Sequence, residues 1–203
     1  MKHLSNVSNN TPQMGCLSSK TDSSDQKSRA TLTTDGQSTV PKLDSRLPFQ
    51  QYRDFFQLKN YWKAVRRRED ASKCLFFRFL TENAEFHPLY KKLSKVELTE
   101  ESAFNSNEFE NMANQYLDVF DEAISAIESS PGDVSTAIDE LMEVGRKHKA
   151  VPNMDASNFS KLESALLYMV QQILLDRFNE KCEDLFKKFF SFVVTNVTKG
   201  FNE

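Results

Sequence analysis

The chain has 203 residues, which is enough for one domain with a buried core plus an appended segment. Its formal net charge is only −3, and its strongest basic run, Arg66-Arg67-Arg68, is followed at once by acidic residues. This balance argues against a nucleic-acid-binding protein. The sequence has no apolar run near the roughly 20 residues that a membrane helix needs, and its three cysteines lack metal-ligand spacing. We therefore expect a cytoplasmic protein.

The beginning of the chain differs in composition from the rest. Residues 1–47 are rich in Ser, Thr, Asn, Gln and Asp and hold few large apolar side chains. Such a segment buries too little apolar surface to offset its ordering entropy, so we expect a disordered tail. Most of the 17 phenylalanines lie in residues 48–203, where Gly and Pro are sparse. This second region is expected to form one folded, helical domain.

A short motif in the tail, Met-Gly-Cys-Leu-Ser-Ser-Lys at residues 14–20, fits the N-myristoylation pattern. Gly15 would accept a myristoyl chain and the adjacent Cys16 a palmitoyl chain, and two such chains hold a protein stably at a membrane surface. The motif works only if translation starts at Met14, because Gly15 otherwise has no free amine. The alternative interpretation is a chance match in a serine-rich segment.

Helical periodicity runs through the folded region, where apolar residues recur at intervals of three and four. This pattern and the turn signals predict the following segments in chain order: helices at 49–67 and 70–82, a short turn or helix at 88–93, a polar loop at 94–107, helices at 108–128 and 134–151, a loop at 152–157, and helices at 158–177 and 178–198. No segment shows the strict alternation typical of a half-buried strand. We predict an all-α fold of six to eight helices.

The segment at residues 144–151, Val-Gly-Arg-Lys-His-Lys-Ala-Val, carries the clearest functional signal. His148 lies on the apolar face of its predicted helix, with neighbours at intervals of three and four, namely Ile138, Leu141, Val144 and Val151. No carboxylate accompanies it on that face, so general acid–base chemistry is not favoured. A lone imidazole there is suited to offer a neutral nitrogen to a metal in a dry pocket. The residues alone leave a packed or surface histidine without a ligand role as the alternative.

From Leu58 to Phe201 the chain resembles the globin family, and is similar to neuroglobin and to cytosolic globins of nematode type. Several segments carry the likeness in the expected order: Trp62 with Val65, Phe76-Phe77-Arg78-Phe79, Pro88-Leu89-Tyr90, residues 109–113, Gly145-Arg146-Lys147-His148-Lys149-Ala150-Val151, residues 163–169 and Lys199-Gly200-Phe201. The resemblance implies a globin fold in which helices surround a haem pocket.

The resemblance also gives His148 a role, because it implies that this residue is the proximal ligand of the iron in haem b. Other residues implied as haem contacts are Phe76, Phe79, Tyr90, Val144, Val151, Phe159 and Leu167. The implied function is reversible binding of dioxygen or another diatomic gas such as CO or NO, of the oxygen-transport type. The sequence shows no nucleophile motif, phosphate-binding loop or carboxylate pair, so we expect no enzyme beyond slow peroxidase-like or nitrite chemistry.

The distal side departs from the family pattern, because Met112 stands where many globins have histidine. Three interpretations stay open. Met112 only packs, since a thioether is an adaptable core filler. Alternatively, Met112 binds iron as a sixth ligand, and a His/Met pair raises the reduction potential. In the third, Tyr116, one turn further along, donates its hydroxyl to bound dioxygen. Tyr90 stands where the family usually has phenylalanine, and its hydroxyl is expected to make the pocket rim wetter.

A second function of a different class is a membrane-associated redox, electron-transfer or signalling globin with a six-coordinate haem. Such a protein needs an electron-donor protein as a partner. An acylated tail and a Met112–iron bond would favour it, since oxygen storage in bulk needs no anchor. A haem-free helical interaction domain is a third hypothesis, and the histidine in its globin-like segment argues against it.

Overall fold

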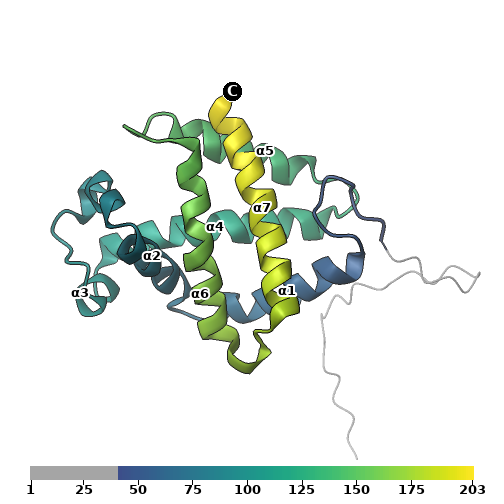
Figure 1. Cartoon of the computed structure of the whole chain (residues 1–203), viewed down its shortest axis with the longest axis horizontal. Helices are drawn as coiled ribbons and strands as arrows, with labels where there is room; N and C mark the ends of the chain where they lie inside the picture. Colours follow the sequence, from purple (N-terminus) through teal and green to yellow (C-terminus); the bar gives the residue numbers. More distant parts are fainter. Residues whose placement is uncertain (1–40) are drawn as a thin grey trace, which may run out of the picture. The chain divides into compact units, whose positions relative to one another are not determined.

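The structure is a computed structural model in which residues 41–203 are described, and the motif at residues 14–20 lies outside this part. The described residues form α-helices and short 3-10 helices (η) without strands (Figure 1). In chain order these are α1 (Tyr52–Arg66), α2 (Ala71–Glu82), η1 (Ala84–Leu89), η2 (Lys91–Leu93), α3 (Glu100–Phe104), α4 (Asn107–Ser129), α5 (Ser135–His148), η3 (Ala156–Leu162), α6 (Glu163–Leu174), η4 (Leu175–Arg177) and α7 (Glu180–Asn202). The prediction of an all-α fold is confirmed.

Polar side chains at the N-termini explain where several helices begin. The hydroxyl of Ser106 accepts a hydrogen bond from the Phe109 N–H at 3.2 Å and caps α4. Thr99 caps α3 in the same way, and two glutamates in the first turn favour the helix dipole. The expected loop at 94–107 therefore contains a short helix, which the apolar pattern alone missed because α3 has only five residues.

Two predicted helices differ from those in the structure. The helix expected at 134–151 ends at His148, because Pro152 disfavours helical backbone in the residue before it. The three residues after His148 form tight turns, in which the Val151 N–H donates to the His148 carbonyl at 3.0 Å. The helix expected at 158–177 begins and ends in 3-10 turns, with α6 between them.

The folded part begins before Pro48, the boundary expected from composition. Leu47 is buried, and the Asp44 N–H donates to the carbonyl of Pro131 at 2.8 Å. The carboxylate of Asp44 accepts a hydrogen bond from the Val134 N–H at 3.1 Å. These contacts tie the segment before α1 to the turn between α4 and α5.

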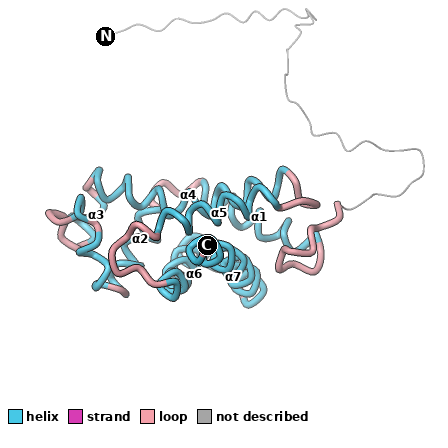
Figure 2. The backbone as a smooth tube through the Cα atoms, turned by 90° about the horizontal axis from the view of Figure 1, so that it is seen from above, coloured by secondary structure: helices cyan, strands magenta, loops and turns pink. Residues whose placement is uncertain are grey.

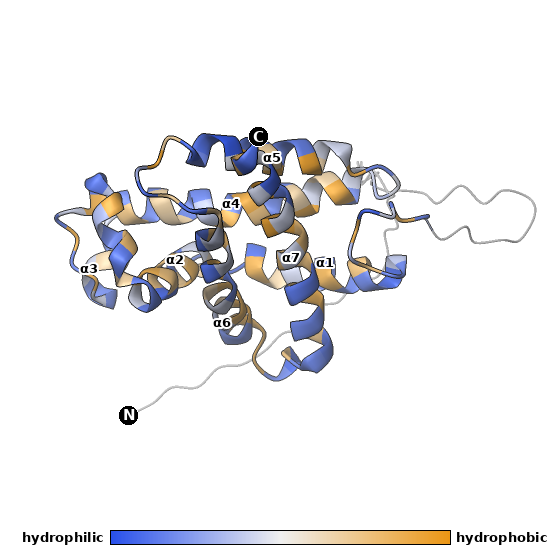
Figure 3. Ribbon diagram, turned by 45° about the horizontal axis from the view of Figure 1, so that its top comes forward, coloured by the Kyte–Doolittle hydropathy of each residue, from blue (hydrophilic) through white to orange (hydrophobic). Residues whose placement is uncertain are grey.

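Helices α6 and α7 lie antiparallel and side by side, and both lie on the same side of α4 and α5 (Figures 1 and 2). Along α4 and α7 hydrophobic and hydrophilic residues alternate in bands (Figure 3), as expected for helices with one buried face. Trp62 anchors the core between Phe120 and Phe186, with ring centroids 6.4 Å and 6.2 Å away. Among the described residues, no helix is both long and apolar enough to span a membrane.

Candidate functional site

A largely apolar cavity of about 530 Å³ lies between α4, α5 and α7 and is closed by η1, η3 and the residue after η1. Its volume falls in the range of pockets that hold small molecules and cofactors. The residues that line it are Phe79, Phe86, Leu89, Tyr90, Met112, Gln115, Tyr116, Val119, Phe120, Val144, Lys147, His148, Val151, Met154, Asn158, Phe159, Leu162, Phe190, Val193, Val194 and Val197. Only Lys147 among them is a lysine, arginine, aspartate or glutamate.

His148 is held in one orientation on the α5 wall of the cavity. Its ring Nδ1 lies 2.7 Å from the carbonyl oxygen of Val144. A carbonyl can only accept, so Nδ1 carries the proton and donates, and the neutral ring leaves Nε2 with a free lone pair. Nε2 makes no hydrogen bond to any described residue. The edge of the Phe159 ring meets the imidazole at 5.3 Å between centroids and 81° between planes, which further limits rotation of the ring.

Two glycines allow α5 to approach α7 until the two backbones touch. A Cβ atom on Gly145 would lie 1.9 Å from the carbonyl oxygen of Val197, and one on Gly200 would lie 1.9 Å from that of Met142. No larger residue fits either position without moving a helix. Because Gly145 is one turn before His148, this close crossing fixes the height and rotation of the histidine relative to the cavity.

The opposite wall is a face of α4 on which Met112, Tyr116 and Phe120 follow at intervals of four. Met112 is half-buried, and its thioether is a soft, polarisable group. Gln115 also lines the cavity from this helix. The α4 wall therefore offers a sulfur, an amide and a phenol to whatever occupies the space in front of His148.

The phenol of Tyr116 is hydrogen-bonded to the phenol of Tyr90, which lies directly after η1. Burial raises the pKa of both hydroxyls above the ordinary value of 10.0, so both stay protonated near neutral pH. The hydroxyl of Tyr90 was expected to make the rim wetter, and that of Tyr116 to donate to bound dioxygen. The structure pairs the two hydroxyls with each other, which leaves one of their two protons free for a further acceptor.

Most of the residues predicted for the site line this one cavity: Phe79, Tyr90, Met112, Tyr116, Val144, His148, Val151 and Phe159. Two do not. Phe76 is fully buried behind the lining, where its ring packs on Tyr90 and Tyr116 at 5.2 Å and 4.8 Å. Leu167 faces a different groove, because α6 has apolar residues on more than one side and periodicity does not tell which side meets the cavity.

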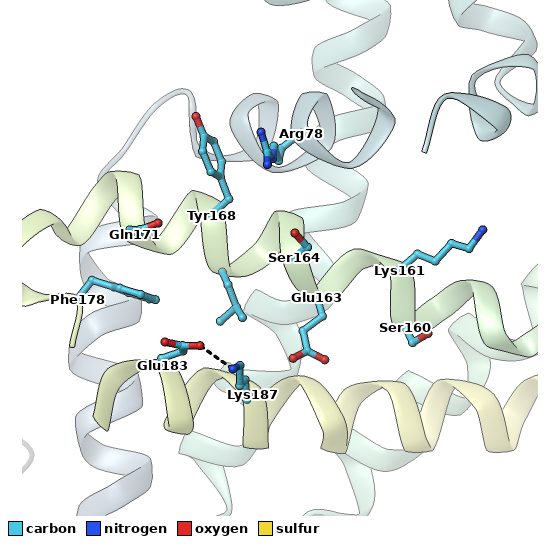
Figure 4. A pocket seen from close by; sticks show the side chains of 11 residues that line it. Arg78, Ser160, Lys161, Glu163, Ser164, Tyr168, Gln171, Phe178, Glu183 and Lys187 are labelled. Carbon is cyan, nitrogen blue, oxygen red and sulfur yellow. Dashed lines mark ion pairs between the residues drawn. The ribbon is translucent and has the colours of Figure 1, made fainter. Parts of the chain in front are cut away.

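That other groove has about 680 Å³ and is more polar (Figure 4). Four of its five charged side chains are engaged with other protein side chains, the exception being Glu163. Lys187 pairs with Glu183 at 2.6 Å, and Arg78 pairs with Glu82 at 2.6 Å and lies 4.5 Å from the ring centroid of Tyr168. No histidine lines it. The groove is therefore no substitute for the cavity at His148.

Sequence reasoning missed more than half of the lining residues, and two contributions among these matter most. Helix α7 supplies four lining side chains, Phe190, Val193, Val194 and Val197, which the apolar pattern placed in the core without showing that they face a space. Lys147, next to the histidine, supplies a positive charge at the lining. Its adjacency to His148 was the only signal available in the sequence.

Known proteins share this sequence pattern and this fold. A family model described as Globin matches residues 73–197. Zebrafish (Danio rerio) neuroglobin is 30% identical over 96 residues, a stretch that spans 47% of this chain and 57% of that protein. This match thus spans less than two thirds of the relative's length.

Solved structures of heme proteins have a similar fold. A hexacoordinated heme protein from an anhydrobiotic tardigrade superimposes with a TM-score of 0.72 at 28% identity, covering 79% of this chain and 99% of the other. The haemoglobin of the botfly Gasterophilus intestinalis superimposes with a TM-score of 0.63 over 74% of this chain and 98% of the other, and its 13% identity shows a shared fold alone. Because the family model covers more than half of the 203 residues, the chain belongs to the globin family.

Proposed function

We propose that this globin binds haem b in the cavity between α4 and α5, with His148 as the proximal ligand, and that it reversibly binds dioxygen or another diatomic gas. The observation that carries the proposal is the hydrogen bond from His148 Nδ1 to the Val144 carbonyl. In the neutral imidazole, this bond makes Nε2 the nitrogen with the free lone pair at the wall of an apolar cavity, which is the form of imidazole that binds iron.

The residues of the cavity fit the group that the family implies. Apolar side chains from α5, η3 and α7 surround the space, including Val144, Phe159 and Val193, and they would bury the flat apolar macrocycle. Haem also carries two carboxylates, and Lys147 is the cation of the lining that can pair with one of them. When bound, haem iron supplies the position at which a diatomic ligand attaches.

The chain's own residues would do three things for such a group. His148 holds its position from α5, and the Phe159 edge keeps the imidazole plane fixed. Val144 keeps Nδ1 protonated, and a ligating histidine with its second nitrogen bonded in this way is a stronger donor. The apolar lining excludes water from the space in front of Nε2.

A haem titration of the purified protein tests the proposal. Wild type should give a Soret band at one haem per chain and distinct ferric, ferrous and carbon monoxide spectra. His148→Ala should release haem at least tenfold faster, and added imidazole should restore the spectrum. His87→Gln is the matched control, because His87 does not line the cavity. A wild-type protein without a Soret band would exclude the proposal, and an unaltered His148→Ala would exclude His148 as the ligand.

A redox role with a six-coordinate haem is the second candidate. It is supported by the half-buried thioether of Met112 on the α4 wall and by the likeness to a tardigrade heme protein described as hexacoordinated. Ligation by both His148 and Met112 would raise the reduction potential of haem, which suits the acceptance of electrons from a donor protein. A low-spin ferrous spectrum that disappears in Met112→Leu and persists in Met154→Leu would establish this ligand. Persistence in both variants would refute it.

A further inference from the structure

The cavity contains two phenol groups that bond each other and nothing else among the described residues. Tyr90 and Tyr116 both line it, and their hydroxyl oxygens are hydrogen-bonded. The surrounding lining is mostly aliphatic and aromatic. A hydroxyl pair in such a place is costly unless each proton has an acceptor, because burying an unsatisfied donor loses its bonds with water.

A count of protons shows that one hydroxyl proton of the tyrosine pair has no acceptor among the described residues. Each phenol carries one proton, so the two hydroxyls hold two protons, and the bond between them uses one. Burial raises the pKa of both groups, so neither loses its proton near neutral pH. One O–H is therefore left to donate, and no described residue accepts from it. An occupant of the cavity can supply that acceptor, because both phenols line it.

Either phenol can be the donor in the bond between them, and the two side chains come from different segments. Tyr116 is on the α4 wall, between Met112 and Phe120, where it faces the space in front of α5. Tyr90 comes from a separate segment, and its backbone is fixed by two bonds: its N–H donates to His87, and its carbonyl accepts from Leu93. Tyr90 is thus held by a segment outside α4, from which its phenol can support that of Tyr116.

Phe76 packs against both tyrosine rings and limits their movement. Its centroid lies 5.2 Å from that of Tyr90, nearly edge to face at 83°, and 4.8 Å from that of Tyr116. Phe76 is itself fully buried, so neither ring can swing toward it. The pair is pre-organised, and a pre-organised donor loses little entropy when an acceptor arrives.

We propose that Tyr90 and Tyr116 work as a single hydrogen-bond donor in which Tyr90 donates to the oxygen of Tyr116, and Tyr116 donates its own proton to a small ligand in the cavity. This inference rests on the proposed function. A chain of two hydroxyls polarises its last proton and strengthens that donation. The unit selects ligands with an accepting atom that bears partial negative charge, such as dioxygen, over carbon monoxide, which accepts weakly.

The haem-loaded protein tests this with three single substitutions: Tyr116→Phe, Tyr90→Phe and, as the matched control, Tyr168→Phe, which changes a tyrosine of the other groove. Tyr116→Phe should speed dioxygen dissociation by about tenfold or more, the effect of losing one hydrogen bond to a polar acceptor. Carbon monoxide dissociation should change by less than about threefold. Tyr90→Phe should give a smaller acceleration, because the second donor remains but loses its support.

The carbon–oxygen stretching frequency of the carbon monoxide complex gives a second readout that does not depend on dioxygen binding. It should rise in Tyr116→Phe, rise less in Tyr90→Phe, and stay at the wild-type value in Tyr168→Phe. A Tyr116→Phe protein that keeps its Soret band but matches Tyr168→Phe in both measurements would overturn the donor role. The double variant Tyr90→Phe/Tyr116→Phe tests whether the two tyrosines act together. If its effect on dioxygen dissociation, as a free energy, equals the sum of the two single effects, the two tyrosines do not form a single unit. Absence of a Soret band in all four proteins would instead reject haem binding, and the donor role with it.

Discussion

The two walls of the cavity are built in different ways. The α5 wall holds its main features, Gly145 and His148, within one turn of a single helix, and the Val144 carbonyl that orients the imidazole is in the same helix. On the α4 wall the main polar feature is the hydrogen-bonded pair of Tyr90 and Tyr116, two residues that are 26 positions apart in the sequence. The main residues of the α5 wall therefore lie in one short stretch of sequence, whereas those of the α4 wall come together only on folding. Four substitutions test how far this contrast extends.

The largest effect is expected at the crossing of α5 and α7. Gly145→Ala places a methyl group 1.9 Å from a backbone oxygen of α7, so the helices must separate. We expect the free energy of unfolding to fall by about 3 kcal/mol, the upper end of the range for overpacking, as measured by chemical denaturation. The control is Gly132→Ala, whose Cβ would meet its nearest neighbour at 3.4 Å. Equal stability of the two variants would mean that the α5 wall does not depend on this close approach.

The next effect concerns the ring that supports the histidine. Phe159→Ala removes the edge contact with His148, and we expect a loss of about 2 kcal/mol in unfolding free energy, less than for a fully buried phenylalanine. Haem release should also become faster. Phe56→Ala is the control, because Phe56 is 44% exposed and should change stability by less than about 0.5 kcal/mol. If haem is released at the same rate from both variants, helix α5 orients His148 without the help of Phe159.

A pH-dependent effect is expected at the turn that joins the two walls. Hydrogen bonds and the ion pair from Arg46, at 2.6 Å, together with the Val134 N–H, hold the pKa of Asp44 well below its ordinary value of 3.8. A group with a lowered pKa in the folded state adds stability above its unfolded pKa, and this contribution disappears as the pH falls further.

Asp44→Asn should consequently lower Tm by about 3 °C at pH 7, equivalent to about one hydrogen bond. The difference from wild type should shrink as the pH falls below about 4. Thermal unfolding monitored by circular dichroism from pH 7 to pH 3 measures it. A difference that grows toward low pH would contradict the assigned role of the carboxylate.

The smallest effect is expected on the α4 wall. Met112→Leu conserves volume, so the free energy of unfolding of the haem-free protein should change by about 0.5 kcal/mol. Met142→Leu provides the comparison, since Met142 is more buried and lies at the α5–α7 crossing. A loss above about 2 kcal/mol in Met112→Leu would show that the α4 wall is packed as tightly as the other, and would remove the contrast.

Local sequence signals predicted much of the fold. The amphipathic pattern located α4 within one residue at each end, because Ser106 caps it and its apolar face is continuous. It missed α3, which is too short to show a period, and it extended α5 past His148. These errors have a common cause: helix ends depend on caps and on the backbone preferences of neighbours more than on periodicity.

The candidate site was predicted unevenly for a related reason. His148 and Val144 were found because they belong to one contiguous motif, and both line the cavity. Leu167 was assigned to the same cavity but faces the second groove. Periodicity identifies which side chains point inward, yet a helix such as α6 touches several neighbours, and only their positions decide which space each side chain enters.

The sequence by itself thus determined that this chain is helical, that His148 stands on an apolar face, and that the surrounding segment resembles a globin, because these properties depend on residues within a few turns of one another. Only the tertiary structure joined Tyr90 to Tyr116, brought Gly145 against Val197, and placed α7 side chains around the cavity. Those contacts link residues distant in the chain, and they exist only when packing brings the helices together.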